Sequence, residues 1–318
     1  MTFKKYLWPT IGGLTIALSA WLLYKELRTL SLDDLGDSFA AISVGHWLLA
    51  GVSTLIAYAA LAGYDRIALM HLGKKIDWWF ITICSFTTYA LSHNVGASVV
   101  SGAVVRYRAY STKGLTPAEI GVLIAVCSIT FIIGTLFLAG LVLVYEPEVL
   151  ERFGDLIPVE ASAATGVAIL LLLALYALAS FLKLRPLKLG SINIVYPAPK
   201  VVVPQLLIAP IELIGAAGII YFALPEAGNP GFLIVLGIFL VSFSAALLSH
   251  APGGLGVLEL VFLTGLPDMN KADVIAALLV FRLFYLIIPF IMALVVILVF
   301  ERSQFRRNNP PDLQRGKD

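Results

Sequence analysis

Residues 247 to 262, LLSHAPGGLGVLELVF, combine helix-breaking residues with groups that could bind an ion, inside a long apolar stretch. Pro252 ends a helix, and Gly253, Gly254 and Gly256 permit a tight turn and the close approach of another group. A helix that begins after Gly254 would direct free N–H groups and a positive dipole end at an anion such as a phosphate. Two interpretations stay open: a turn that only lets two helices pack closely, or a turn that also binds a ligand.

Three ionisable residues lie deep in apolar stretches. Arg282, in ALLVFRLFYLIIPF, lies roughly 14 Å into its helix at 1.5 Å per residue. Glu212, in PQLLIAPIELIGAAG, lies at a similar depth, and Glu259 follows the turn. Such charges usually pair or face a cavity. Arg282 therefore either forms an ion pair with Glu212 or Glu259 that locks helices together, or holds an anionic ligand with one carboxylate as counter-charge. Pro210 and Pro289 predict kinks in the two helices.

A second interruption, LSHNVGA, carries His93 and Asn94, so that with His250 one histidine stands at each break. Such a histidine is either a hydrogen-bonded packing residue or a proton carrier. Arg106 and Arg108 follow the first break and, being two residues apart, cannot share a helix face. Either one turns inward while the other meets lipid phosphates at the membrane surface, or both only anchor the chain there.

The composition excludes an ordinary soluble domain. The chain has 318 residues, of which 59% are hydrophobic and 13% charged, and its mean hydropathy is +0.93. Cys84 and Cys127 lie in apolar runs, which indicates buried thiols and not a disulfide. No spacing indicates a metal site, a nucleotide-binding loop or a hydrolase, so we expect neither metal nor cofactor. The chain is predicted to be an all-α polytopic membrane protein.

Eight apolar segments can be placed in the membrane. The basic start and long apolar stretch of the N-terminus favour a retained first span over a cleaved signal peptide, because ALSAW is a poor cleavage site. Two segments, about 78–105 and 231–266, are interrupted at the breaks described above. The six that are predicted to cross fully are roughly 7–24, 46–63, 118–145, 163–182, 201–223 and 273–300.

The distribution of Lys and Arg predicts the orientation, because basic loops stay in the cytoplasm. With both termini cytoplasmic, most basic residues fall inside if each interrupted segment is a re-entrant hairpin that enters and leaves on one side. A single crossing at 78–105 would instead place RYRAYSTKG outside. The re-entrant arrangement predicts one domain over 1–300, with halves 1–150 and 160–300 as a possible inverted repeat and a basic tail at 301–318. Binding sites of such repeats lie where the broken helices meet.

SHNVGASVVSGAVVRYRAYSTKGLTPAEI and SHAPGGLGVLELVF, with the downstream AALLVFRLFYLIIPF, closely resemble one known family. This is the lysylphosphatidylglycerol synthase transmembrane-region family, a flippase-like domain, with its stand-alone YbhN-like inner-membrane members. The resemblance covers nearly the whole chain and implies movement of an aminoacylated phospholipid between leaflets. By motif it implies roles for Asn94, Gly96, Arg106, Tyr107, Arg108, Pro252, Gly253, Gly254, Gly256, Glu259 and Arg282.

We therefore expect a bacterial inner-membrane lipid translocator whose ligand is a membrane phospholipid with an anionic or aminoacylated head group, and no nucleic acid. The short basic tail leaves no room for the synthetase domain of longer family members, so we expect no enzyme activity. Two alternatives stay open: a scaffold that presents a lipid to a separately encoded enzyme, and a secondary transporter for a small anion. A homo-oligomer is also compatible with the sequence. The candidate substrate-binding residues are His93, Asn94, Arg106, Arg108, Glu212, His250, Pro252, Gly253, Gly254, Gly256, Glu259 and Arg282.

Overall fold

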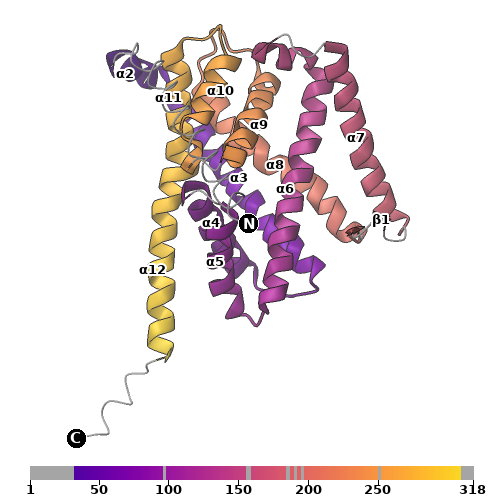
Figure 1. Cartoon of the computed structure of the whole chain (residues 1–318). Helices are drawn as coiled ribbons and strands as arrows, with labels where there is room; N and C mark the ends of the chain where they lie inside the picture. The colour runs from indigo at the N-terminus through magenta and orange to yellow at the C-terminus, as the bar shows by residue number, and fades with distance from the viewer. Residues whose placement is uncertain are drawn as a thin grey trace, which may run out of the picture.

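The structure, a computed structural model, describes residues 32–95, 98–154, 159–183, 187–189, 192–194, 197–249 and 252–308. Within them the fold is all-α apart from one short antiparallel hairpin, which confirms the predicted class (Figure 1). The elements are α2 (Leu32–Ala41), α3 (Val44–His71), α4 (Trp78–Val95), α5 (Ser98–Ser111), α6 (Pro117–Tyr145), η1 (Pro147–Phe153), α7 (Val159–Phe181), β1 (Leu187–Leu189), β2 (Ile192–Ile194), α8 (Pro199–Ala223), α9 (Phe232–Ser249), η2 (Pro252–Gly254), α10 (Val257–Gly265), α11 (Lys271–Phe281), η3 (Arg282–Ile287) and α12 (Ile288–Asn308).

Six helical stretches among the described residues are long and apolar enough to cross a membrane. Five of them, α3, α6, α7, α8 and the continuous α11–η3–α12, correspond to predicted spans. The sixth is α9, the first arm of the interrupted segment 231–266. The predicted span 7–24 lies outside the described residues.

Two broken helical hairpins approach each other from opposite ends of the bundle. Figure 1 shows α4 and α5 in its lower half and α9 and α10 in its upper half, beside long helices that pass both. The contacts agree, because α4 packs against α5, η2 and η3, and α9 packs against α10 and η2. This is the arrangement that an inverted repeat requires, although the repeat and the re-entry from one membrane side stay predictions.

Helix α8 lies at the centre of the bundle and packs against α3, α6, α9 and α11. Small residues make the close approach possible. A side chain at Gly215 would place its Cβ 2.9 Å from the carbonyl oxygen of Ser53 on α3, and one at Gly134 on α6 would meet the Ala209 Cβ of α8 at 2.5 Å. Glycine is therefore required at both contacts, and Glu212 of α8 is held deep in the protein.

Helix η3 is a π-helical turn just before Pro289, where the sequence predicts a distortion. Proline has no N–H, and its ring clashes with the carbonyl four residues earlier, that of Tyr285. Tyr58 donates its O–H to this carbonyl at 2.9 Å. Asn94 Nδ2 donates to the neighbouring carbonyl of Leu286 at 3.1 Å. Side chains from α3 and α4 thus satisfy backbone groups that a distorted helix exposes.

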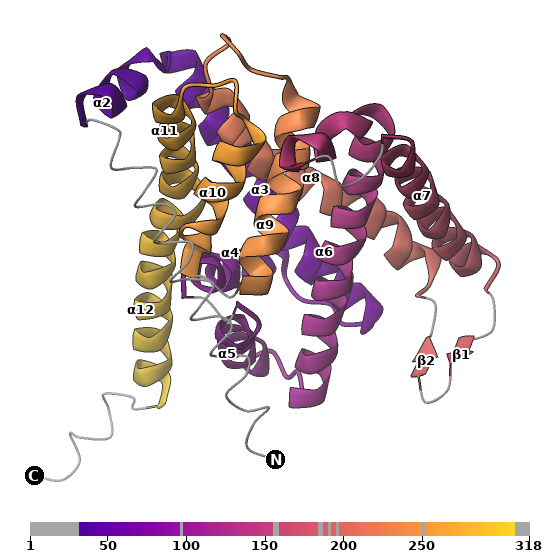
Figure 2. The ribbon, with the colours of Figure 1, turned by 45° about the horizontal axis from the view of Figure 1, so that its top comes forward.

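The two-stranded hairpin β1–β2 was not predicted from the sequence. Its register pairs Leu187 with Ile194 and Leu189 with Ile192. Figure 2 shows it beyond the ends of α7 and α8, away from the bundle. It takes no part in the site described below.

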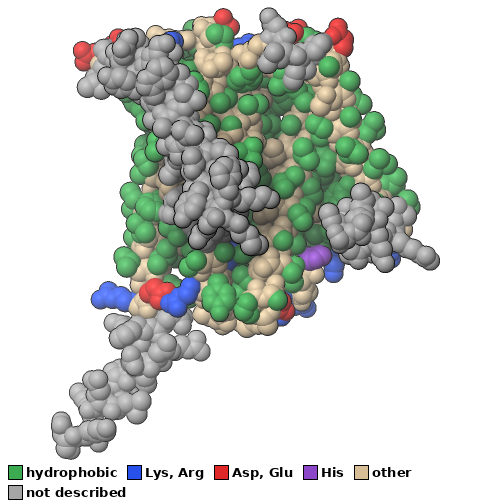
Figure 3. Space-filling view, in the orientation of Figure 1, with side chains coloured by type: hydrophobic (Ala, Val, Ile, Leu, Met, Phe, Trp, Pro, Cys, Tyr) green, Lys and Arg blue, Asp and Glu red, His purple; other side chains and the backbone are tan. Residues whose placement is uncertain are grey.

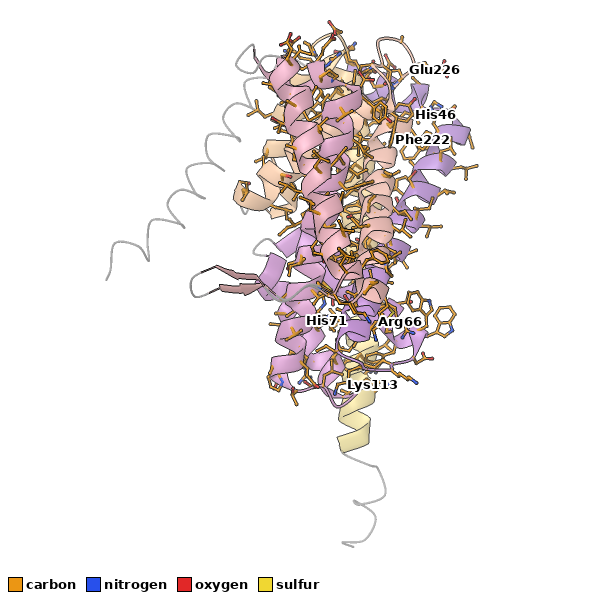
Figure 4. All side chains as sticks on the ribbon, turned by 90° about the vertical axis from the view of Figure 1, so that its right-hand side faces the viewer. His46, Arg66, His71, Lys113, Phe222 and Glu226 are labelled. Carbon is orange, nitrogen blue, oxygen red and sulfur yellow. The ribbon has the colours of Figure 1, made fainter. Side chains whose placement is uncertain are left out.

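The surface is divided as a membrane protein requires. Figure 3 shows an apolar face between two ends where charged side chains gather. In Figure 4, Arg66, His71 and Lys113 lie toward one end, and His46 and Glu226 lie toward the other. Soluble proteins rarely expose so wide an apolar surface to water, because exposing it is unfavourable. This surface must therefore face lipid.

Candidate functional site

A cavity of about 280 Å³ lies inside the bundle, between the first broken hairpin and the helices α3, α6, α8 and α9. Phe131 and Phe243 contribute to its apolar wall. An enclosed polar group in a membrane protein is costly unless it is satisfied or has a function. The polar part of the wall includes Tyr64, Tyr89, Ser92, His93, Arg106 and Glu212.

The cavity extends to the apolar outer surface at α6. Two of its lining residues on this helix, Ser128 and Ile132, are exposed, the latter by 52%. Leu247 of α9, which is partly exposed, also lines it. A ligand with one polar end and one apolar end would therefore find both environments here.

Arg106 reaches the cavity from α5 and pairs with Asp65 of α3. Its Nη2 lies 2.7 Å from Asp65 Oδ1, and its Nε donates to Oδ2 at 3.4 Å. Tyr110 also donates to Asp65 Oδ2, at 2.8 Å, and the guanidinium carbon lies 4.9 Å from the centre of the Tyr89 ring. Both charged side chains are buried. The cost of burying these two charges is offset because each neutralises the other, and because the Tyr110 hydroxyl and the Tyr89 ring contact the pair.

Arg108 has the opposite environment. Its side chain is 58% exposed and donates to Glu301 of α12 at 2.6 Å. It does not line the cavity, and neither does the half-exposed Tyr107. The sequence argument that Arg106 and Arg108 occupy different helix faces is therefore correct, with Arg106 inside.

Glu212 is 1% exposed and lines the cavity from α8. Tyr285 donates to its Oε1 at 2.7 Å, and Tyr64 donates to its Oε2 at 3.3 Å. Among the described residues, no Lys, Arg or His forms an ion pair with it. Of the two partners that the sequence left open for Arg282, Glu212 is thus not the one.

Arg282 pairs with Glu259, its other candidate partner. Its Nε donates to Glu259 Oε1 at 2.9 Å, and its Nη1 donates to the carbonyl of Gly253 at 2.8 Å. The second oxygen of Glu259 accepts the N–H of Gly256 at 2.9 Å, so a carboxylate of the protein already occupies the start of α10. Gly253, Gly254 and Gly256 have φ angles of 58°, 64° and 80°, which glycine adopts without strain. None of these residues lines the cavity.

His93 and Asn94 lie near the end of α4, a helix that packs against η2 of the second hairpin. The His93 ring lines the cavity and stacks on the ring of Tyr285, with 5.1 Å between centroids. Its Nδ1 is buried without a hydrogen-bond partner. Asn94 donates to carbonyls on both sides, of Ala90 at 2.8 Å and of Leu286. His250 and Gly96 lie outside the described residues, and of Pro252 only the backbone, within η2, is described.

The sequence analysis missed Asp65, Tyr64 and Tyr285. Asp65 stands beside Arg66, two residues after the expected end of a span, and therefore has the appearance of a surface charge. The span in fact continues to His71, which buries Asp65 completely. The available signal was the apolar run 67–70 after Arg66, which is typical of a helix that continues past the two charges. In the described part of the chain, no group of three His, Cys, Asp or Glu residues could hold a metal ion.

Residues 11–293 match the family described as the lysylphosphatidylglycerol synthase TM region. The chain belongs to this family. It is 32% identical over 302 residues to the uncharacterized protein slr0712 of Synechocystis sp., covering 93% of this chain and 92% of that protein. It is 31% identical over 252 residues to the inner membrane protein YbhN of Escherichia coli, covering 78% and 77%. The resemblance inferred from the two broken segments is confirmed. The described residues alone contain six candidate spans, so the chain is a multi-pass membrane protein.

Longer proteins share the same region. The phosphatidylglycerol lysyltransferase of Staphylococcus haemolyticus is 29% identical over 285 residues, which cover 86% of this chain but 32% of that protein. The lysyltransferase of Bacillus subtilis is 24% identical, with 33% of its length covered. This chain thus corresponds to about a third of the lysyltransferases, and to most of the two shorter relatives.

Proposed function

We propose that this protein moves a phospholipid between the leaflets of the bacterial inner membrane, through the cavity lined by Arg106 and Glu212. The observation that carries the proposal is the position of the cavity. It contains buried polar groups, yet reaches the apolar surface at Ile132 and beside Leu247. A phospholipid has the matching division, because its head group requires polar partners and its acyl chains require an apolar path.

Arg106 is the group that would hold the phosphate. A guanidinium has five N–H donors, and two bonds from Arg106 go to Asp65. Planar, paired donors suit phosphate oxygens. Arg282 is less suited, because Glu259 and the carbonyl of Gly253 already accept from it. We therefore assign Arg282, Glu259 and the glycine turn to the shape of the second hairpin, and a direct ligand role for them stays a prediction.

The relatives support the location and the class of ligand. One is named an inner membrane protein, and the longer ones are named for a transferase that acts on phosphatidylglycerol. A membrane region shared with such enzymes is well placed to handle the same kind of lipid. Phosphatidylglycerol and its lysyl form are therefore the first candidates for this chain.

Two features of the cavity favour a lipid over the alternatives. A small soluble anion needs a path sealed from lipid, whereas exposed residues of α6 line this cavity. A scaffold needs no buried polar space, whereas here Arg106, Glu212 and His93 share one. Both features argue for a polar head group inside and acyl chains at the side.

Reconstitution in liposomes tests the proposal. Fluorescent phosphatidylglycerol or its lysyl form is placed in both leaflets, and dithionite is added outside. In protein-free liposomes about half of the probe is quenched, because only the outer leaflet is accessible. The proposal predicts that wild-type protein takes quenching well past this limit, and that Arg106→Gln does not.

Arg108→Gln is the matched control, since it removes the same charge from an exposed site on the same helix. Arg282→Ala and Glu259→Gln, assayed in parallel, test whether the second hairpin also contributes. If wild-type protein behaves as empty liposomes do for every lipid tried, the translocator proposal fails and the scaffold becomes the better explanation.

A further inference from the structure

Three carboxylates are buried in the membrane-spanning part of the described structure, and only two have a cationic partner. Asp65 pairs with Arg106, and Glu259 pairs with Arg282. The third, Glu212, accepts hydrogen bonds only from tyrosine hydroxyls. Burying an ionised carboxylate without a cation costs free energy, and such a group usually becomes neutral by binding a proton.

The groups that face Glu212 come from every side of the cavity. Helix α3 contributes Tyr64, and η3 contributes Tyr285. Helix α4 contributes His93, whose ring is stacked on Tyr285. Helix α5 contributes Arg106, already neutralised by Asp65, and α6 contributes Cys127. Helix α9 has no ionisable residue among Phe232–Ser249. Glu212 is therefore the cavity's one carboxyl group without a cation within the described part of the chain.

We propose that Glu212 is a proton-binding site that couples lipid movement to the proton gradient, with one proton carried in the same direction as each anionic head group. This inference rests on the function proposed above. Glu212 is suited to the role because it lines the same cavity as Arg106.

The coupling follows from electrostatics. A phosphate held at Arg106 and an ionised Glu212 would repel each other across a small cavity of low dielectric constant. Protonation removes this repulsion, so the proton and the phosphate each strengthen the binding of the other. Water on one side donates the proton to a carboxylate oxygen, and the same O–H bond breaks on the other side. Because the proton balances the single charge of phosphatidylglycerol, the combined movement transfers no net charge.

The test uses wild-type protein in liposomes with short-chain fluorescent phosphatidylglycerol and a pH difference of one unit across the membrane. Extraction with albumin measures the probe in the outer leaflet after equilibration. One-to-one coupling predicts accumulation on the alkaline side, approaching roughly tenfold at equilibrium. Nigericin, which collapses the pH difference, should abolish it, and protein-free liposomes give the background. Glu212→Asp should still accumulate the probe in response to the pH difference. Glu212→Gln should show no such accumulation, however fast it moves the probe.

The outcomes separate this inference from the proposed function. If wild-type protein equilibrates the probe but the pH difference does not bias it, the proton role of Glu212 is wrong while translocation stands. If wild-type protein does not move the probe, both proposals fail. A response that persists in Glu212→Gln and disappears in His93→Gln would overturn the assignment and transfer the role to the histidine.

Discussion

Two buried ion pairs lie in the membrane-spanning helices that the structure describes, and they differ in what surrounds them. Asp65–Arg106 joins α3 to the first hairpin, and Glu259–Arg282 joins the second hairpin to η3. The side-chain exposures are similar, 0% and 6% in the first pair and 8% and 11% in the second. Only the first lies at the cavity, through Arg106.

The second pair is hydrogen-bonded to backbone groups of the broken segment. Arg282 donates to the carbonyl of Gly253, and Glu259 accepts the N–H of Gly256. It therefore satisfies groups that the broken helix leaves open, as an irregular backbone within a membrane requires. The two pairs are buried to a similar degree, so burial alone does not distinguish their roles. The role of a buried ion pair depends on whether it lies at a cavity or is hydrogen-bonded to backbone groups.

The largest effect on lipid translocation is expected at the first pair. Arg106→Gln should lower the rate of lipid translocation at least tenfold, because the phosphate loses its donor, and a tenfold loss corresponds to only about 1.4 kcal/mol. Arg108→Gln should stay within about twofold of wild type. The dithionite assay measures both rates. Equal losses of rate in the two variants would show that the position of the arginine relative to the cavity does not matter, and would contradict a special role for the first pair.

The largest effect on stability is expected at the second pair. Glu259→Gln should lower the free energy of unfolding by about 3–5 kcal/mol, because it leaves Arg282 buried without a counter-charge. The double variant Glu259→Gln/Arg282→Gln should recover much of this loss. Chemical unfolding in detergent, followed by circular dichroism, measures it. A single variant as stable as wild type would mean that the pair does not hold the break together.

The smallest effect is at the carbonyl of Tyr285, next to the second pair. Tyr58→Phe removes the hydroxyl that bonds to it and should cost about 1 kcal/mol. Tyr107→Phe is the control, because that side chain is 49% exposed. Thermal unfolding of the two proteins in the same detergent provides the comparison. An equal shift in both would argue that η3 does not depend on this bond.

The sequence predicted the features that depend on neighbouring residues. Pro252 and the glycines after it mark a break, because their backbone preferences are local. The opposite faces of Arg106 and Arg108 follow from helix geometry and are found in the structure. The expected distortion before Pro289 corresponds to the π-helical turn η3.

The sequence could not predict which charges meet. Arg106 pairs across 41 residues and Arg282 across 23, and both choices depend on how the helices pack. Two carboxylates were equally plausible for Arg282 until the structure placed Glu212 among tyrosines. Asp65 was overlooked because the end of α3 is not marked by the apolar pattern. The cavity is lined by α3, α4, α5 and α6 together with α8 and α9, so it depends on how these helices pack and is not marked by any one stretch of sequence.

The most direct test of the central claim compares two doubly neutralised proteins, Asp65→Asn/Arg106→Gln and Glu259→Gln/Arg282→Gln. Both remove a complete buried pair, so neither leaves an unpaired charge. The account predicts that the first leaves phosphatidylglycerol quenching by dithionite at the protein-free level, while the second remains within a few-fold of the wild-type rate. Wild-type activity in the first protein, or its loss only in the second, would contradict the claim that lipid passes through the Arg106 cavity.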